Sequence, residues 1–281
     1  ATSFAAGASG FPLCFLDYND DQKDKIIIRN KRAILSTVKS LVELVKPKFY
    51  LPYAGYFSEK SSRDSEINKR NFKNSPSDII NIITMDSNVT GINPMINDTM
   101  IFDLDKKTVN YSNLRSDLIY NYNEKYFENY INRFKKSYLV NEDQICNYFT
   151  NSNYNDNLEL YIVPTDDFFN SENLGYLIKF GTKILVEKLN STELENTYNK
   201  LSSTKKICIY IRREALGQLV INNQPWEDAS IGFQMRIKRT PNIYNAKFWY
   251  HFTNEYVGSE NYRYASHCGA CNLIDQNPKY V

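Results

Sequence analysis

An amphipathic helix followed directly by a short apolar strand constrains the fold of this chain more than any other feature. Between residues 29 and 46, apolar residues recur at helical spacing and define one face: Ile34, Leu35, Val38, Leu41, Val42 and Val45. Pro47 cannot continue this helix, and residues 49–53 (Phe-Tyr-Leu-Pro-Tyr) are typical of a short buried strand. The pattern therefore predicts an α/β layered unit in which Leu41 and Leu51 lie in neighbouring layers.

Other local signals predict further elements. Ser75 as N-cap and Pro76 at the first helical position announce a helix through Ile83. Polar residues 58–74 are expected to form a solvated loop. The remaining predictions are a strand at 100–102, a helix over 119–138 with a tyrosine-rich packing face, a helix after Asn141, a strand at 158–163, a hairpin over 177–189, and a strand at 207–211.

A second amphipathic helix is predicted near the end of the chain. It begins at Pro225 and places Trp226, Ala229, Phe233 and Ile237 on one face. The α/β signals become weaker near residue 90, so we expect domains over 1–90 and 91–281, the second being a mixed, helix-rich α/β extension.

Composition excludes several classes of protein. The 34 Lys and Arg against 32 Asp and Glu leave a net charge of +2, which is too small to indicate nucleic-acid binding. No apolar run reaches the ~20 residues of a membrane-spanning helix, so no membrane insertion is expected. Five Cys in 281 residues indicate reduced thiols and a cytoplasmic protein. Because the chain starts at Ala1 without an initiator Met, we expect the natural protein to begin upstream.

Residues that could carry chemistry are few. The two histidines, His251 and His267, are well apart in the chain and few for an imidazole metal centre, which needs two or three converging on one point, and a Ser-His-Asp arrangement needs at least one placed beside a nucleophile. His251 is expected to be a half-buried structural residue. The segment His267-Cys268-Gly269-Ala270-Cys271 has CxxC spacing but lacks the further ligands of a closed zinc site. Asp166-Asp167 follows a predicted strand and could bind a divalent ion, but adjacent carboxylates on a turn usually diverge into water. No metal site and no catalytic residue is therefore assigned.

Four segments together resemble one family. They are 4–12 (Phe-Ala-Ala-Gly-Ala-Ser-Gly-Phe-Pro), 46–57 (Lys-Pro-Lys-Phe-Tyr-Leu-Pro-Tyr-Ala-Gly-Tyr-Phe), 71–76 (Asn-Phe-Lys-Asn-Ser-Pro), and the spaced residues between Trp226 and Trp249. In these segments the chain resembles the CMP-N-acetylneuraminate hydroxylases (CMP-sialic acid monooxygenases). The likeness extends over nearly the whole chain and is loose between about residues 86 and 205.

The resemblance implies a fold, an activity and partners. Such enzymes join a Rieske 2Fe-2S iron-sulfur domain to a metallo-β-lactamase-like αββα sandwich with a C-terminal extension. They convert CMP-N-acetylneuraminate to CMP-N-glycolylneuraminate with oxygen and electrons relayed from NADH through cytochrome b5. The chain would then be the C-terminal part, an incomplete and by itself inactive fragment. The Cys-x-His and Cys-x2-His ligands of the cluster are absent from this sequence and would lie upstream.

One departure bears on a rival function. Metal-dependent hydrolases of this fold commonly deliver a His after such a helix, whereas residues 51–56 read Leu-Pro-Tyr-Ala-Gly-Tyr. Tyrosine is a poor substitute for imidazole as a ligand of a first-row metal. The alternatives that stay open are a metal-dependent hydrolase of metallo-β-lactamase fold and a non-catalytic binding module.

Candidate residues for a nucleotide-sugar pocket follow from the resemblance and from chemistry. Backbone amides, phenols and an ammonium group suit a phosphodiester and a sugar carboxylate. The predicted substrate-binding residues are Gly7, Ser9, Gly10, Tyr53, Tyr56 and Lys73, together with Arg236, which is expected on a largely buried helix.

Overall fold

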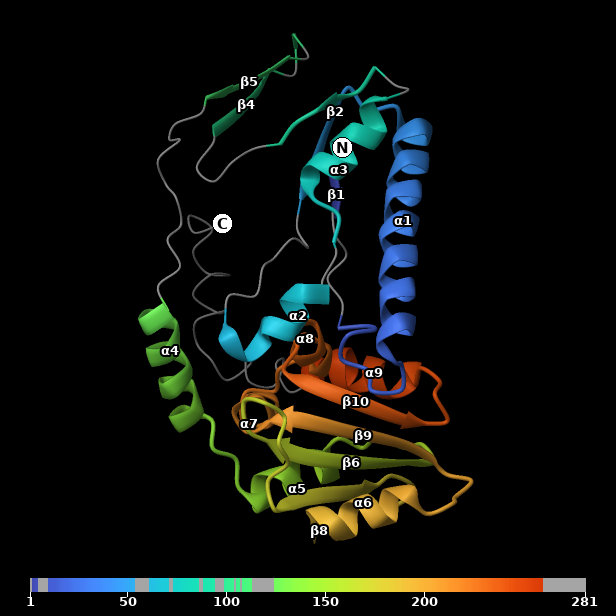
Figure 1. The fold of residues 1–281 in the computed structure, drawn as a ribbon, viewed down its shortest axis with the longest axis vertical. Helices are drawn as coiled ribbons and strands as arrows, with labels where there is room; N and C mark the ends of the chain where they lie inside the picture. Colours follow the sequence, from blue (N-terminus) through green and yellow to red (C-terminus); the bar gives the residue numbers. More distant parts are fainter. Residues whose placement is uncertain are drawn as a thin grey trace. The chain divides into compact units, whose positions relative to one another are not determined.

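The computed structural model describes residues 2–4, 10–53, 61–70, 73–85, 88–93, 99–103, 105–106, 108–112 and 124–259. It divides into two compact units (Figure 1). Unit 1 comprises Ala1–Pro12 and Asn19–Tyr126, and unit 2 comprises Leu13–Tyr18 and Phe127–Val281. Both units are of mixed α/β type, which confirms the predicted fold class at that level. The predicted domains 1–90 and 91–281 stay a prediction.

Unit 1 is built on a three-stranded parallel sheet with β2 (Phe49–Tyr53) between β1 (Thr2–Phe4) and β3 (Thr90–Gly91). The long helix α1 (Asp20–Val45) starts at Asn19, whose side chain and that of Gln22 form a reciprocal capping box. The helix α3 (Pro76–Thr84) starts at the predicted N-cap, Ser75. One apolar cluster joins these elements, so the predicted layering of helix and strand is confirmed. Its buried members are Val38, Val42, Tyr50, Ile79, Ile83 and Val89.

The prediction that Leu41 belongs to the packed face of α1 is wrong in detail. The side chain of Leu41 is 48% exposed and that of Val45 is 61% exposed, and Leu51 is only half-buried. Val38 and Val42 instead contact the cluster, because a buried stripe on a helix facing one other element is narrower than the whole apolar run. The predicted face of α1 was therefore too wide.

The predicted loop over 58–74 is also corrected. Residues Ser62–Asp64 form the 3-10 turn η1 and Ser65–Arg70 form the short helix α2. Arg70 pairs with Asp20 at 2.7 Å and with Asp24 at 3.3 Å, which links α2 to the first turns of α1. Arg70, which the sequence places in a solvated loop, thus makes tertiary contacts. The predicted strand at 100–102 is confirmed as β4 (Thr99–Asp103), which pairs with β5 (Thr108–Ser112) in an antiparallel ladder.

Unit 2 is organised by a five-stranded mixed sheet with the order β10-β9-β6-β7-β8. Its strands are β6 (Leu158–Thr165), β7 (Leu174–Lys179), β8 (Leu185–Asn190), β9 (Lys205–Arg212) and β10 (Met235–Thr240). Only β6 and β9 are parallel neighbours, and the other ladders are antiparallel. The predicted strands at 158–163 and 207–211 and the hairpin over 177–189 are confirmed.

Helices cover both faces of this sheet (Figure 1). One face carries α6 (Ser191–Asn199) over a cluster that includes Tyr161, Leu194 and Cys208. The other helices of the unit are α4 (Glu124–Ser137), α5 (Glu142–Asn151), α7 (Arg213–Ile221), α8 (Trp226–Ile231) and α9 (Ala246–Tyr250), which continues into the π-helical turn η2 (His251–Glu255). Coverage on both faces explains why β6 is almost continuously apolar and buried.

The predicted helix through Trp226 and Ile237 is wrong in its second half. The helix α8 ends at Ile231, and residues 235–240 form β10, paired with β9. Phe233 has a φ of 57°, so the chain turns there instead of continuing the helix. The aromatic face expected on the helix over 119–138 is also not a core face, since Tyr126 is 66% and Tyr130 is 46% exposed. Residues 119 and 122 lie outside the described part.

Backbone hydrogen bonds and a buried ion pair join the segment Leu13–Tyr18 to the outer edge of β10. Backbone bonds join Leu16 N to Ile237 O and Ile237 N to Cys14 O, both at 2.7 Å. The Arg239 Nε donates to Asp17 Oδ2 at 3.1 Å, and the two side chains are 4% and 8% exposed. Asp17 Oδ1 also accepts the Arg239 backbone N–H at 3.0 Å.

We expect Asp17→Asn to lower the free energy of unfolding by about 2 kcal/mol, because it leaves the Arg239 charge buried without its counter-charge while one amide oxygen can still accept. Urea unfolding followed by tryptophan fluorescence measures this. Glu187→Gln is the control, since the Lys179–Glu187 pair is 40% and 44% exposed and should contribute less than about 1 kcal/mol. Equal losses in the two variants would contradict a special role for the buried pair.

Candidate functional site

The residues predicted to bind a nucleotide sugar are only partly described. Gly7, Ser9 and Tyr56 lie outside the described residues. Gly10 is buried, and Tyr53 ends β2 with its side chain 45% exposed. Lys73 lies between α2 and α3, and its Nζ is buried. The binding roles of these residues stay predictions.

Arg236 lies on β10 and not on the helix expected for it. Its guanidinium carbon is 4.0 Å from the centre of the Phe169 ring, and Nη1 donates to the carbonyls of Phe233 and Met235. Arg212 lies 4.7 Å from the centre of the same ring. These contacts assign Arg236 a packing role in unit 2, and its proposed contact with substrate stays a prediction.

Asn74, in the segment 71–76, is a structural anchor that the sequence does not predict. Its side chain is fully buried, and Nδ2 donates to the Lys31 carbonyl of α1 at 3.0 Å. Asn beside an N-cap Ser is an ordinary loop composition, so nothing in the local pattern distinguishes this anchor. The contact shows that Asn74 has a packing role within unit 1.

The described residues contain no cluster of three or more His, Cys, Asp or Glu side chains that could hold a metal ion. His251 is the described histidine, and its Nδ1 lies 2.9 Å from Glu255 Oε2 while its Nε2 lies 2.8 Å from the Ser152 carbonyl. Both ring nitrogens are thus engaged, and the expected half-buried structural role of His251 is confirmed. His267, Cys268 and Cys271 lie outside the described residues.

None of the described helices combines the length and the apolar character needed to cross a bilayer.

The buried thiol of Cys208 is unsuited to nucleophilic catalysis. Burial raises its pKa from 9.0 to about 12, and burial likewise raises the pKa of the neighbouring Tyr198 hydroxyl to about 12. A thiol that keeps its proton at neutral pH is a poor nucleophile. For Cys146 the pKa is also raised, first by partial burial and then by Glu142 and Asp143.

These shifts predict that stability falls in alkali. The folded state excludes the Cys208 thiolate, so stability is full below pH 9 and is lost as the pH rises from 9 towards 12. Each such group can contribute a slope of up to about 1.4 kcal/mol per pH unit. Urea unfolding at pH 8, 9 and 10 should therefore show a shallower decline for Cys208→Ala than for the parent chain. Parallel declines in the two proteins would show that Cys208 ionises as freely in the folded state as in the unfolded state.

Asp166 and Asp167 diverge, as expected for adjacent carboxylates on a turn. Asp166 accepts the backbone N–H groups of Phe168 and Asn170 and the Asn170 side chain, and these hydrogen bonds, led by that of the side chain, lower the pKa of its carboxyl. Asp167 instead pairs with Lys135 of α4. The two carboxylates therefore make different direct contacts, although the charge of Lys135 also contributes to the lowered pKa of Asp166.

A polar cavity of about 210 Å³ nevertheless lies beside them, at the carboxyl ends of β6 and β9. We call it the carboxylate pocket; it is lined by Lys135, Thr165, Asp166, Asp167, Phe168, Glu172, Arg213 and Glu214. Thr165 is almost fully buried, and its Oγ1 has no hydrogen-bond partner within the part of the chain that the structure describes. Lys135 pairs with Asp167 and Arg213 pairs with Glu172, so both cationic side chains of the lining already have a carboxylate partner within the pocket.

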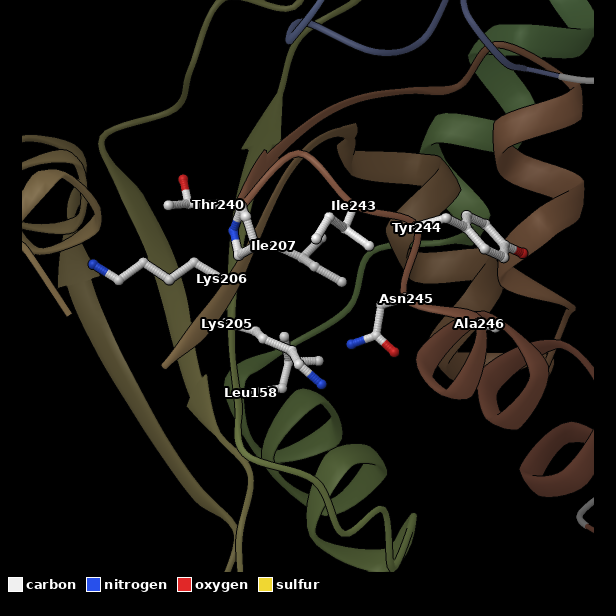
Figure 2. Close-up of a pocket in the computed structure, with 10 residues that line it drawn as sticks. Leu158, Lys205, Lys206, Ile207, Thr240, Ile243, Tyr244, Asn245 and Ala246 are labelled. Carbon is white, nitrogen blue, oxygen red and sulfur yellow. The ribbon is translucent and has the colours of Figure 1, made fainter. Parts of the chain in front are cut away.

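A second cavity lies at the opposite ends of the same two strands and has a different character (Figure 2). It measures about 240 Å³ and is mostly apolar; we call it the lysine pocket, and its lining residues are Leu158, Lys205, Lys206, Ile207, Thr240, Pro241, Ile243, Tyr244, Asn245 and Ala246. Leu158 and Ile207 are buried members of the sheet, whereas Ile243 is 67% exposed. The pocket could not be predicted from the sequence, because it is formed by the starts of β6 and β9 together with residues 240–246, which are distant in the chain.

Comparison with curated proteins shows similarity along most of the chain. A cytidine monophosphate-N-acetylneuraminic acid hydroxylase of Danio rerio is 29% identical over 90% of this chain and 44% of its own length. The Mus musculus protein of the same name is 29% identical over 89% of this chain and 44% of its own length. A Homo sapiens protein named as an inactive form is 28% identical over 89% of this chain and 51% of its own length.

These matches confirm the resemblance to CMP-N-acetylneuraminate hydroxylases that the four sequence segments indicated. The chain spans about half the length of the curated relatives it matches. No family model and no solved structure matches the chain. The α/β class is therefore established from the fold itself, and the metallo-β-lactamase-like sandwich remains a proposal.

Proposed function

We propose that this chain is part of a monooxygenase that hydroxylates the N-acetyl methyl group of CMP-N-acetylneuraminate to give CMP-N-glycolylneuraminate. One observation carries the proposal. The similarity to proteins named as CMP-N-acetylneuraminic acid hydroxylases extends over about nine tenths of the chain, so it includes residues of both compact units.

The fold is compatible with the proposed architecture. In unit 1, α1, α3 and the parallel strand β2 share one apolar cluster, as expected for part of an αββα sandwich of metallo-β-lactamase type. In unit 2, the five-stranded sheet carries two cavities at its opposite ends. We infer that the chain supplies scaffold and substrate contacts to the enzyme.

The reaction consumes O2, two electrons and two protons. One oxygen atom enters the methyl C–H bond to form CH2OH, and the other leaves as water. We propose that the electrons come from NADH through cytochrome b5. The proposed 2Fe-2S cluster does not fit the described residues, which offer no group of His and Cys ligands to hold it. The chemistry assigned here to the described residues is accordingly substrate binding.

The proposal is tested with the complete coding sequence that contains these 281 residues. The purified product is incubated with CMP-N-acetylneuraminate, O2, NADH, cytochrome b5 and its reductase, and the nucleotide sugar is analysed by mass spectrometry. We expect a product that has gained one oxygen atom, with incorporation of label from ¹⁸O2. Omitting NADH should abolish this product.

Two outcomes would contradict the proposal. Release of CMP or a free sugar without any reductant would favour the metal-dependent hydrolase. Binding of CMP-N-acetylneuraminate with no oxygenated product, in a preparation with its full complement of iron, would favour the binding module.

A further inference from the structure

The lysine pocket has the size of a site for one end of a ligand. Its volume of about 240 Å³ is below the roughly 300–1,000 Å³ of pockets that enclose a drug-sized molecule. Apolar side chains from two strands and from the segment after β10 line it: Leu158, Ile207, Pro241 and Ile243. An apolar lining of this kind suits the faces of a planar ring better than the hydroxyl groups of a sugar.

The charge of the pocket is positive. Its ten lining residues include two lysines and no Asp or Glu. Lys206 is buried, and its Nζ donates to the carbonyls of Tyr198 and Lys200 at 2.8 and 2.6 Å. In Figure 2 its side chain extends away from Asn245 and Ile243. The Lys206 ammonium group is therefore already hydrogen-bonded at the end of α6.

Lys205 is the lysine available to a ligand. Its side chain is 59% exposed, and the nearest ion-pair partner, Asp156 Oδ2, lies 3.8 Å away. An exposed pair at that distance is worth little, so the phosphodiester anion of a nucleotide sugar could displace the carboxylate at low cost. Lys205 therefore offers an anion site at the edge of an apolar pocket.

Asn245 offers a directed hydrogen-bond donor in the same pocket. Its Oδ1 accepts the Phe248 N–H at 3.1 Å and so caps α9. The Asn245 side chain lies near the Tyr154 hydroxyl, where it partly offsets the rise in pKa that burial causes. Asn245 Nδ2 itself is buried, and it makes no hydrogen bond of normal geometry to any described residue. Figure 2 shows the side chains of Asn245 and Lys205 reaching towards each other below Ile207 and Ile243. A buried donor without an acceptor is costly unless a ligand supplies one.

We propose that the lysine pocket binds the cytidine 5′-monophosphate end of CMP-N-acetylneuraminate, an inference that rests on the proposed function. The cytosine ring lies against Ile207 and Ile243, a base oxygen or ring nitrogen accepts from Asn245 Nδ2, and the phosphate faces Lys205. The sialic acid end projects out of the pocket, because its hydroxyl groups and carboxylate find few partners in an apolar lining. Residues of β9 and of the segment after β10 thus recognise the nucleotide in this proposal.

Isothermal titration of the 281-residue chain with CMP, CMP-N-acetylneuraminate and free N-acetylneuraminate tests the inference. Asn245→Asp keeps the capping oxygen for Phe248 but removes the donor and adds a negative charge. Lys205→Gln removes the exposed cation. We expect each variant to bind CMP and CMP-N-acetylneuraminate about tenfold or more weakly, which is the scale of one charge-assisted hydrogen bond. Free N-acetylneuraminate should not compete with CMP.

Lys183→Gln is the matched control, because Lys183 is an exposed lysine of the β7–β8 turn outside the pocket. It removes the same charge from unit 2 and should leave both affinities unchanged. Thermal unfolding of each variant confirms that the fold is retained, and Lys205→Gln provides the test if Asn245→Asp fails to fold.

The outcomes separate this inference from the proposed function. Binding of CMP-N-acetylneuraminate that is unchanged in both pocket variants overturns the inference and leaves the proposed function standing. Absence of CMP binding by the parent chain also overturns it, and the oxygenation assay on the complete coding sequence then decides the proposed function independently. If Lys183→Gln and Lys205→Gln weakened the binding of CMP equally, the loss of affinity would be explained by overall charge alone. That result would likewise overturn the inference.

Discussion

Trp226→Ala is expected to lower the free energy of unfolding of unit 2 by about 3–5 kcal/mol, the range for removing a large buried aromatic side chain. The Trp226 side chain is fully buried, and its Nε1 donates to the Tyr148 hydroxyl at 2.9 Å. Its ring lies about 6 Å from those of Phe149, Phe248 and Phe252. The substitution therefore opens a cavity and also leaves a buried hydroxyl without its donor.

Urea unfolding followed by the fluorescence of Trp249 measures this loss in unit 2. Tyr250→Ala is the control, since that side chain is exposed and its removal should change stability by less than about 0.5 kcal/mol. A loss below 1 kcal/mol in Trp226→Ala would mean that the aromatic cluster does not hold unit 2 together.

Gly217→Ala is expected to destabilise unit 2 by about 3 kcal/mol, although alanine is normally the better helix former by about 1 kcal/mol. A Cβ atom at position 217 would lie 1.9 Å from the Tyr138 carbonyl oxygen and 2.7 Å from its carbon. Because the obstacle is backbone, α7 and the chain after α4 would have to separate. Because of the close approach, a substitution that normally stabilises a helix is expected to destabilise this one.

Gly181→Ala is the matched control, because a Cβ there meets no atom within 4 Å. Thermal unfolding of the two variants should therefore differ widely, with Gly181→Ala close to the parent chain. If Gly217→Ala raised the melting temperature, as helix propensity alone predicts, the close contact between α7 and Tyr138 would be refuted.

The sequence predicted elements whose signals are local. The helix stopped by Pro47, the N-caps at Ser75 and Asn141, and the alternating strands of the hairpin are all fixed by residues within one or two turns. Such signals combine propensity, capping and periodicity, and the structure confirms them. The family resemblance was readable in the same way, from short segments with unusual spacing.

The predictions from sequence are wrong where contacts with residues distant in the chain determine the structure. Trp226 to Ile237 fits a helical period, but pairing of residues 235–240 with β9 draws the second half into the sheet. The tyrosines of α4 have the spacing of a core face, but Tyr126 and Tyr130 remain exposed. Periodicity reports which residues share a face and does not report whether another element covers it.

The candidate site was missed for the same reason. Lys205 and Asn245 are separated by forty positions, and neither belongs to a recognisable motif. Only the register of β9 with β10 and the cap of α9 bring them to one cavity. Their signal in the sequence was limited to the Ile243-Tyr244 pair within the family-like segment.

The placement of Leu13–Tyr18 in unit 2 has a practical consequence. The backbone passes from unit 1 to unit 2 after Pro12, returns at Asn19, and passes over again after Tyr126. No single break in the backbone therefore gives two fragments that each contain one whole unit, because a break after Tyr126 keeps unit 1 in residues 1–126 but removes Leu13–Tyr18 from unit 2. Expressing 127–281 alone would remove the segment that neighbours β10 and leave Arg239 without Asp17, so we expect this truncation to destabilise unit 2.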